Sequence, residues 1–242
     1  MPRPQVIVDR RLFISSVAAG CAVAASEVKA AFAGDLSQAS INSLMERLQE
    51  VRSQLPAATP AEQNAFIYRL SAAAMLVDEF PIPGLSPFGK TGVEIGPLAR
   101  TQPPTDRIHG IALVSYRMAP GAWLQPHNHP HYSVTTIGME GEALVRHFEP
   151  SESAPPMDSR EAFTVRQTAE RVLRHGEATT LTPSRDNIHT FQAGPRGARF
   201  VDLFSIHGDD IGFSYLKIGA KPTLAGADTY AASWIGKQPS NY

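Results

Sequence analysis

Cysteine is almost absent from this chain of 242 residues, in which Cys21 is the only one. From residue 22 onward the sequence therefore contains no thiol that could ligate zinc, build a disulfide framework or act as a nucleophile. A segment without cysteine also cannot mispair in an oxidising compartment, so its composition suits a protein that leaves the cytoplasm.

The chain also lacks an excess of charge of either sign. It has 22 Lys and Arg residues against 23 Asp and Glu residues, which gives a formal net charge of -1. Binding to nucleic acids or to anionic membrane surfaces relies on clustered positive charge, so the composition predicts neither as a partner. With 43% hydrophobic and 19% charged residues, it is typical of one globular domain with a sizeable core.

No hydrophobic run is long enough to form a permanent membrane span. The best candidate, Phe13 to Ala25, is shorter than the roughly 20 residues that a bilayer requires. It follows the arginine pair Arg10-Arg11 and precedes Ala31-Phe32-Ala33, which has the small-x-small pattern of a cleavage site. This order of features resembles a twin-arginine signal, which carries a folded protein across the bacterial inner membrane.

We therefore expect residues 1–33 to be an export signal, the twin-arginine machinery to be a partner, and the mature protein to be periplasmic. An ordinary secretory signal and a buried amphipathic helix are alternative interpretations of the same segment. A third is a lipoprotein signal with Cys21 as the attachment site, although Ala18 stands where a larger aliphatic residue is usual.

Residues 34–90 are predicted to form a helical segment. Apolar residues between positions 36 and 55 recur at the spacing of one helical face. A second helix is predicted to begin at Thr59-Pro60-Ala61-Glu62, a capping box with proline at the first helical position, and to end before Pro81. We interpret these two helices as scaffold or as an oligomer contact.

Residues 91–220 change to short runs of β-forming residues separated by turns, and residues 221–242 are expected to be an irregular tail. The runs predict an all-β jelly-roll barrel preceded by the two α-helices. Met139-Glu140, between two glycines, is expected to form a hairpin, and residues 149–160 an exposed loop. The nine runs are Gly110 to Arg117, Tyr132 to Ile137, Glu142 to Phe148, Phe163 to Arg166, Arg171 to His175, Ala178 to Thr182, Ile188 to Ala193, Ala198 to Ser205 and Gly212 to Ile218.

Three histidines carry the strongest chemical signal. His127 and His129 are spaced i, i+2, so that on a strand both side chains point to the same face. His189 enters another β-forming run sixty residues after His129. Two imidazoles from one strand and one from a neighbour form a three-nitrogen face suited to a divalent transition metal, with coordination positions left open.

Four further residues are candidates for the chemistry around this metal. His131 has the same strand parity as the histidine pair and is a possible fourth ligand or pocket acid, although a surface position is common for such a residue. Asp202 and Asn187 are candidates to hold the free ring nitrogen of a ligand, with Asp202 preferred. His207 is a candidate pocket residue, whereas His109, His147 and His175 have no partner motif and are expected at the surface. Trp123 and Tyr132, which flank the ligands, are explained as well by packing as by substrate contact.

The first histidine segment resembles the first motif of the cupin superfamily. That motif is a glycine, five residues, His-x-His, a short gap, a glutamate and a closing glycine. Gly121, the two histidines and Gly141 fit it, but Val134 stands at the glutamate position. The second cupin motif, Pro-x-Gly-x-x-His, is matched by Pro183 and His189 with one extra residue between them. The absent glutamate points to the three-histidine branch of the superfamily.

Within that branch the chain is similar to the family of cysteamine dioxygenase and plant cysteine oxidase. The residues that carry the resemblance are Gln125-Pro-His-Asn-His-Pro130, Asp186-Asn-Ile-His-Thr-Phe-Gln-Ala193, the strand around Asp202, and Phe213-Ser-Tyr215. The likeness covers roughly residues 105–218. The family's Pro-Pro-Tyr after the aspartate strand is replaced by Ser205-Ile-His207, so the tyrosine near the family's metal is missing.

The resemblance implies an Fe(2+)-dependent dioxygenase with His127, His129 and His189 as metal ligands. A small or peptidyl thiol and O2 would be its substrates, and a sulfinic acid its product. Asp202, His207 and His131 are the candidate catalytic residues, and of these Asp202 corresponds to an aspartate in the matching strand of the family. The alternatives are a three-histidine oxygenase for a diketone or phenol, and a cupin that binds a metal or ligand without turnover. No arginine is securely placed to bind a substrate carboxylate, with Arg117 and Arg185 as the candidates.

Overall fold

The computed structural model describes residues 45–46, 48–49, 59–74, 91–100, 110–207, 212–223 and 227–238. The predicted export signal, residues 1–33, lies outside these residues. Of the first predicted helix, 36–55, only four helical residues are described, so the expected pair of helices stays a prediction. In the described part, no helix is both long and apolar enough to cross a membrane.

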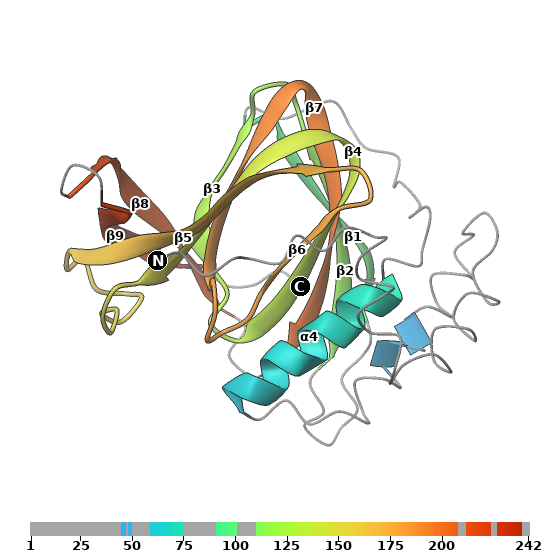
Figure 1. The fold of residues 1–242 in the computed structure, drawn as a ribbon, viewed down its shortest axis with the longest axis horizontal. Helices are drawn as coiled ribbons and strands as arrows, with labels where there is room; N and C mark the ends of the chain where they lie inside the picture. Colours follow the sequence, from blue (N-terminus) through green and yellow to red (C-terminus); the bar gives the residue numbers. More distant parts are fainter. Residues whose placement is uncertain are drawn as a thin grey trace.

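The second predicted helix is present as α4 (Pro60–Ala74). Its start has the predicted capping box, because the Glu62 backbone N–H donates to Thr59 Oγ1 at 3.3 Å and the Thr59 N–H donates to Glu62 Oε2 at 2.9 Å. α4 packs on the outside of the sheet, where Ser71 Oγ and Thr135 Oγ1 lie 2.6 Å apart (Figure 1). α4 therefore covers one outer face of the β structure.

Strands dominate the described residues, so the expectation of a predominantly β protein is confirmed. All strand pairs are antiparallel, and the order of hydrogen-bonded neighbours is β1-β2-β7-β3-β8-β9-β5-β4-β6. The strands are β1 (Val93–Arg100), β2 (Ile111–Met118), β3 (Trp123–Asn128), β4 (Tyr132–Pro150), β5 (Phe163–Arg174), β6 (Ala178–Leu181), β7 (Ile188–Ile206), β8 (Phe213–Pro222) and β9 (Thr229–Gln238).

The two longest strands, β4 and β7, organise the barrel. They pair with each other along most of their lengths, and this pairing closes the ring β7-β3-β8-β9-β5-β4 (Figure 1). The first half of β7 pairs with β3 and the second half with β2. The same long strand therefore runs through both the histidine site and the main apolar core.

Alternation along the strands decides which side chains face that core. Val114 and Tyr116 of β2 and Phe200 and Phe204 of β7 belong to one buried cluster. The intervening residues, such as Leu203, are on the opposite face. A second apolar cluster, around Trp234, combines side chains of β4, β5, β7, β8 and β9.

The hairpin expected at Met139-Glu140 is wrong, because β4 continues through both residues to Pro150. The glycines there accommodate irregularities in the pairing with β7, between Gly138 and Glu140 and between Gly141 and Ala143. The glycines therefore allow close contact between the two strands here and do not form a turn. The tail also differs from expectation: β9 pairs with β5 and β8, and it buries Ala232 and Trp234.

Gly141 shows this constraint most clearly. Its φ is 63°, and a Cβ added to it would lie 2.2 Å from the Gly197 carbonyl oxygen. We expect Gly141→Ala to lower the free energy of unfolding by at least about 2 kcal/mol in urea denaturation. Gly121→Ala is the matched control, since φ is 70° but no atom lies within 4 Å of the added Cβ. Equal losses in both variants would show that close contact with β7 does not matter.

Candidate metal centre

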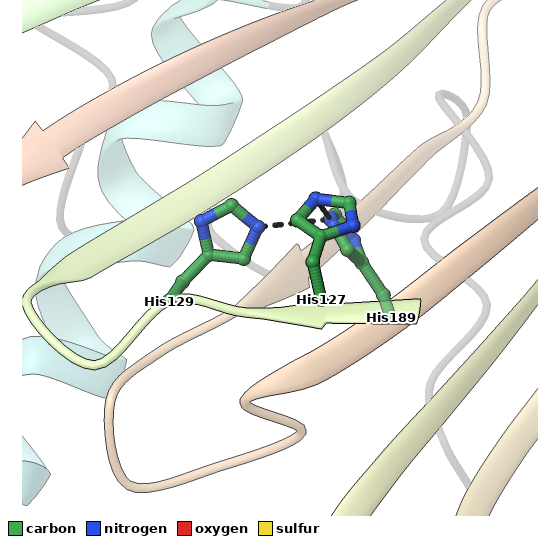
Figure 2. Close-up of side chains that lie close together, drawn as sticks. All are labelled: His127, His129 and His189. Atoms are coloured by element: carbon green, nitrogen blue, oxygen red, sulfur yellow. Dashed lines mark hydrogen bonds between the residues drawn. The ribbon is translucent and has the colours of Figure 1, made fainter. Parts of the chain in front are cut away.

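The structure brings the three predicted histidines together. β3 and β7 place His127 directly opposite His189 in their antiparallel register, and His129 follows one residue after the end of β3. All three side chains are buried, and their ligand atoms lie within 4.8 Å of one another. Figure 2 shows the three rings converging on one point from these two segments.

The closest atoms of this group are the Nε2 nitrogens. His189 Nε2 lies 3.0 Å from His129 Nε2 and 3.1 Å from His127 Nε2 (Figure 2). His127 Nδ1 is 2.9 Å from the Gln125 carbonyl oxygen, which can only accept a hydrogen bond. Nδ1 of His127 must therefore carry the proton, which leaves an Nε2 lone pair directed at the other two rings.

Burial keeps these imidazoles neutral. Desolvation lowers the pKa of His127 from 6.5 to about 4, although the hydrogen bond to Gln125 opposes this shift. The pKa values of His129 and His189 lie well below 6.5, first because of burial and then because of repulsion from the neighbouring histidines. Neutral imidazole is the form that binds a metal, so all three are ready to act as ligands at neutral pH.

The spacing of the nitrogens fits a metal ion. Two nitrogens at neighbouring corners of an octahedron, each about 2.1 Å from the metal, lie about 3.0 Å apart. The two Nε2 separations in the structure, 3.0 and 3.1 Å, agree with this value. One neutral nitrogen also cannot satisfy two others with a single proton, whereas a cation at the centre accepts all three lone pairs. The site is therefore a metal-binding site, and it implies a metal cofactor.

Asn187 supports His129 through the backbone. Its Nδ2 donates to the His129 carbonyl oxygen at 2.8 Å, and its Oδ1 accepts from the His129 N–H at 3.3 Å. The His129 N–H also donates a hydrogen bond to the backbone carbonyl of Asn187. Asn187 thus fixes the position of a ligand residue, but it does not hold an imidazole nitrogen, as the sequence had suggested.

Asp202 lies inside the barrel on the same face of β7 as Phe200 and Phe204, and it is 1% exposed. Its hydrogen-bond partner is Thr136, while its Oδ1 has no partner in the described part of the chain. Burial raises the pKa of Asp202 from 3.8 to about 7, and the Thr136 hydrogen bond opposes this shift. The expectation that Asp202 holds a ligand ring is therefore not supported by its contacts.

His207 and His131 lie apart from the cluster. His207 Nε2 is 2.7 Å from Ser133 Oγ, and the His207 ring has an edge contact with Phe66 of α4. Because α4 covers the outer face, His207 faces away from the barrel interior. His131 is in the turn before β4, where its carbonyl accepts from the His207 N–H, and it is not in the wall of the cleft.

His147 is the residue that the sequence reasoning missed. It was expected at the surface, but it is 2% exposed and lies opposite His189 in the β4–β7 register. Its ring centroid is 6.0 Å from that of His189, and its Nε2 is 2.9 Å from Thr179 Oγ1. Desolvation lowers the pKa of His147 to about 4, although Asp186, 3.9 Å away, raises it. His147 has the same parity along β4 as the apolar residues Ala143 and Val145, and this alternation could have predicted that its side chain is buried.

The histidines open onto a cleft of about 370 Å³, including its open mouth. His127 and His129 are in its wall, whereas His189 is not. None of the described residues that line it carries a charged side chain. Trp123, which flanks the ligands in sequence, is 53% exposed and donates to Thr190 Oγ1. The wall residues are Ile95, Tyr116, Leu124, His127, His129, Tyr132, Phe204, Phe213 and Tyr215.

The two candidate arginines are engaged elsewhere. Arg117 Nη2 forms an ion pair with Glu94 at 2.6 Å across β1 and β2. Arg185 contacts Asn64 of α4, Asp186 and Thr180. Neither is in the cleft wall.

No protein-family model and no curated protein sequence matches this chain. Solved structures of similar shape include an oxalate oxidase in complex with glycolate, with 21% identity and a TM-score of 0.38 over 52% of this chain and 56% of that chain. KdgF from Halomonas sp. has 20% identity and a TM-score of 0.35, covering 49% of this chain and 83% of its own. Pro-11S globulin of pumpkin has 14% identity and a TM-score of 0.37, covering 50% and 28%.

These three are cupin-fold proteins. The chain spans little more than half the length of the oxalate oxidase. With TM-scores below 0.5 and identities below 25%, neither the activities nor the ligands of these proteins transfer to this chain.

Proposed function

We propose that this protein is an iron-dependent thiol dioxygenase on a cupin jelly roll, which adds both atoms of O2 to the sulfur of a thiol. The balanced reaction converts RSH and O2 into the sulfinic acid RSO2H. The observation that carries the proposal is the set of three neutral imidazoles, His127, His129 and His189, whose Nε2 atoms converge beside an uncharged cleft. In the described part of the chain no carboxylate lines that cleft, in keeping with Val134 at the position of the cupin glutamate.

Three uncharged ligands leave a bound ferrous ion with its full double positive charge and with open positions, which favours binding of a thiolate together with O2. The protein contributes the orientation of the ligands. The Gln125 carbonyl sets the tautomer of His127, and Asn187 holds the backbone of His129.

The residues of the cleft wall exclude water and supply a neutral hydrogen-bond donor. Its Phe and Leu side chains exclude water from the substrate's sulfur. The ring of Tyr215 lies 5.9 Å from that of His127, and burial raises the pKa of Tyr215 above 10.0. The phenol therefore keeps its proton at neutral pH and can donate it in a hydrogen bond to a bound anion.

Oxygen consumption tests this proposal. Iron-reconstituted residues 34–242 should take up O2 with at least one member of a thiol panel, and the product should be the thiol plus two oxygen atoms by mass. Protein with a full complement of ferrous iron that takes up no O2 with any thiol would contradict the proposal.

A second candidate is a three-histidine oxygenase that acts on a phenol or a diketone. The aromatic wall of the cleft favours it, because Tyr116, Tyr132 and Phe204 can pack against a planar substrate. The same oxygen electrode distinguishes the two, with catechol and pentane-2,4-dione in place of the thiols. Firmly bound zinc or nickel, with no O2 uptake for any substrate, would indicate a binding protein without turnover.

We also propose that residues 1–33 direct this protein to the periplasm by the twin-arginine route. The support is chemical: copper and zinc bind more tightly than ferrous iron to an all-nitrogen site, so folding around iron before export avoids their competition. Fractionation of the native host should find processed protein in the periplasm. Unprocessed protein confined to the cytosol would contradict this.

A further inference from the structure

Among the residues that the structure describes, the wall of the cleft contains no charged side chain that could neutralise a charged substrate. It is built from Tyr, Phe, Leu, Ile and two histidines. The two histidines direct their Nε2 atoms at His189 in the metal centre. Moving a carboxylate or an ammonium from water into such a wall is unfavourable unless an opposite charge meets it.

Arg117 does not supply that opposite charge, because its side chain lies on the outer face of the barrel. It lies in register with Glu94 on β1, beside Tyr116, whose side chain faces the barrel. Alternation along β2 therefore directs Arg117 to the outer face, where it pairs with Glu94.

The aromatic groups around the histidines are fixed in place. Tyr116 stacks on Phe200 at 5.0 Å between ring centroids. The ring centroids of Tyr132 and Phe204 lie 5.9 and 5.8 Å from that of His129, and the centroid of Phe213 lies 6.1 Å from that of His127. An apolar body that fills this space would pack against rings that already have defined positions, with little further ordering cost.

From this wall we infer that the substrate is a thiol whose body is uncharged and apolar, aromatic or branched, with the thiol as its sole ionisable group. The inference rests on the proposed function and narrows its substrate class. It excludes amino-acid thiols such as cysteine and amine thiols such as cysteamine as the preferred substrates. An ammonium tail would face the positive charge of the metal as well as the apolar wall. A carboxylate tail would find no cationic side chain among the described residues of the wall, so the metal that the thiolate already binds would be its sole partner there.

Binding to the cobalt(II)-loaded full-length protein tests this without turnover. Three thiols share the same two-carbon link to sulfur and differ only at the far end: 2-phenylethanethiol, cysteamine and 3-mercaptopropionate. The sulfur-to-cobalt charge-transfer absorption, titrated under nitrogen, reports direct coordination by each. We expect 2-phenylethanethiol to bind at least about tenfold more tightly than either charged thiol, the ratio that about 1.4 kcal/mol produces.

The outcomes separate this inference from the proposed function. If a charged thiol binds as tightly as 2-phenylethanethiol or more tightly, the apolar substrate class is wrong while thiol binding stands. If none of the three produces the charge-transfer absorption on protein with a full complement of cobalt, the proposed thiol chemistry fails first.

A charge placed at the mouth provides a second test. Ile95 lines the cleft and is 45% exposed, so Ile95→Arg adds a cation there without burying it. We expect this variant to bind 3-mercaptopropionate up to about fivefold more tightly than wild type, the size of an exposed ion pair. Ile235→Arg is the matched control, since Ile235 is 53% exposed and outside the cleft wall. Equal gains in both variants would mean that overall charge, rather than the cleft, selects the thiol.

Discussion

Replacing His189 with alanine is expected to abolish stable metal binding and the O2 uptake that depends on it. His189 Nε2 lies within 3.1 Å of both other Nε2 atoms, so its loss removes the shared centre of the site. Loss of residues that merely support a ligand weakens metal binding by about 10- to 100-fold, so loss of a ligand should exceed about 100-fold. Cobalt(II) titration, followed by absorption, measures the change in affinity.

His189 is a favourable residue for this test because it does not line the cleft. Its truncation therefore leaves the substrate-facing wall in place. His175→Ala is the matched control: its Nδ1 lies 2.6 Å from the Met139 carbonyl, and it does not belong to the converging group. Circular dichroism should show both variants folded. If His189→Ala binds cobalt(II) with an affinity within tenfold of wild type, the three histidines are not the metal site.

The second large effect concerns stability. Asp202→Asn is expected to stabilise the protein by up to about 4 kcal/mol above pH 7, and to have little effect near pH 4. The folded-state pKa of Asp202 is raised to about 7, against 3.8 when unfolded. Below pH 3.8 the Asp202 carboxyl is protonated in both the folded and the unfolded state, so its ionisation does not change the free energy of unfolding. As the pH rises toward 7, the unfolded state ionises first, and the folded state loses stability relative to it.

Asparagine removes this loss because it stays neutral at every pH. Urea denaturation at pH 4, 6 and 8 measures the difference between the variant and wild type, which should grow with pH. Asp228→Asn is the matched control, since Asp228 is exposed and its carbonyl supplies the contact with Gln167. A constant difference across the three pH values would show that the Asp202 carboxyl does not titrate in this range.

The spacing of the histidines along the chain was sufficient to predict the metal centre. An i, i+2 pair on a strand must share one face, and the glycine and proline around it resemble a known motif. The capping box at Thr59 was equally predictable, because its two hydrogen bonds join residues only three apart. Local geometry determines features of this kind.

Residues whose roles depend on distant partners were not predictable in the same way. His147 carried no motif, yet its pairing with β7 places it opposite His189. His207 is close to Asp202 in sequence, but the opposite parity directs it to α4 on the outer face. β9 was expected to be irregular, and it is held as a strand by β5 and β8. In each case the deciding contact lies far away in the chain.

The sequence by itself determined which residues could bind a metal, that the protein is mostly β, and where α4 begins, because these depend on residue chemistry and on spacing along one segment. Only the tertiary structure decided which side chains surround the metal centre and what charge they carry. Register between strands selected Tyr215 and His147 as neighbours of the ligands, and burial set their protonation. Neither register nor burial is a property of one segment, since both arise only when separate strands pack together.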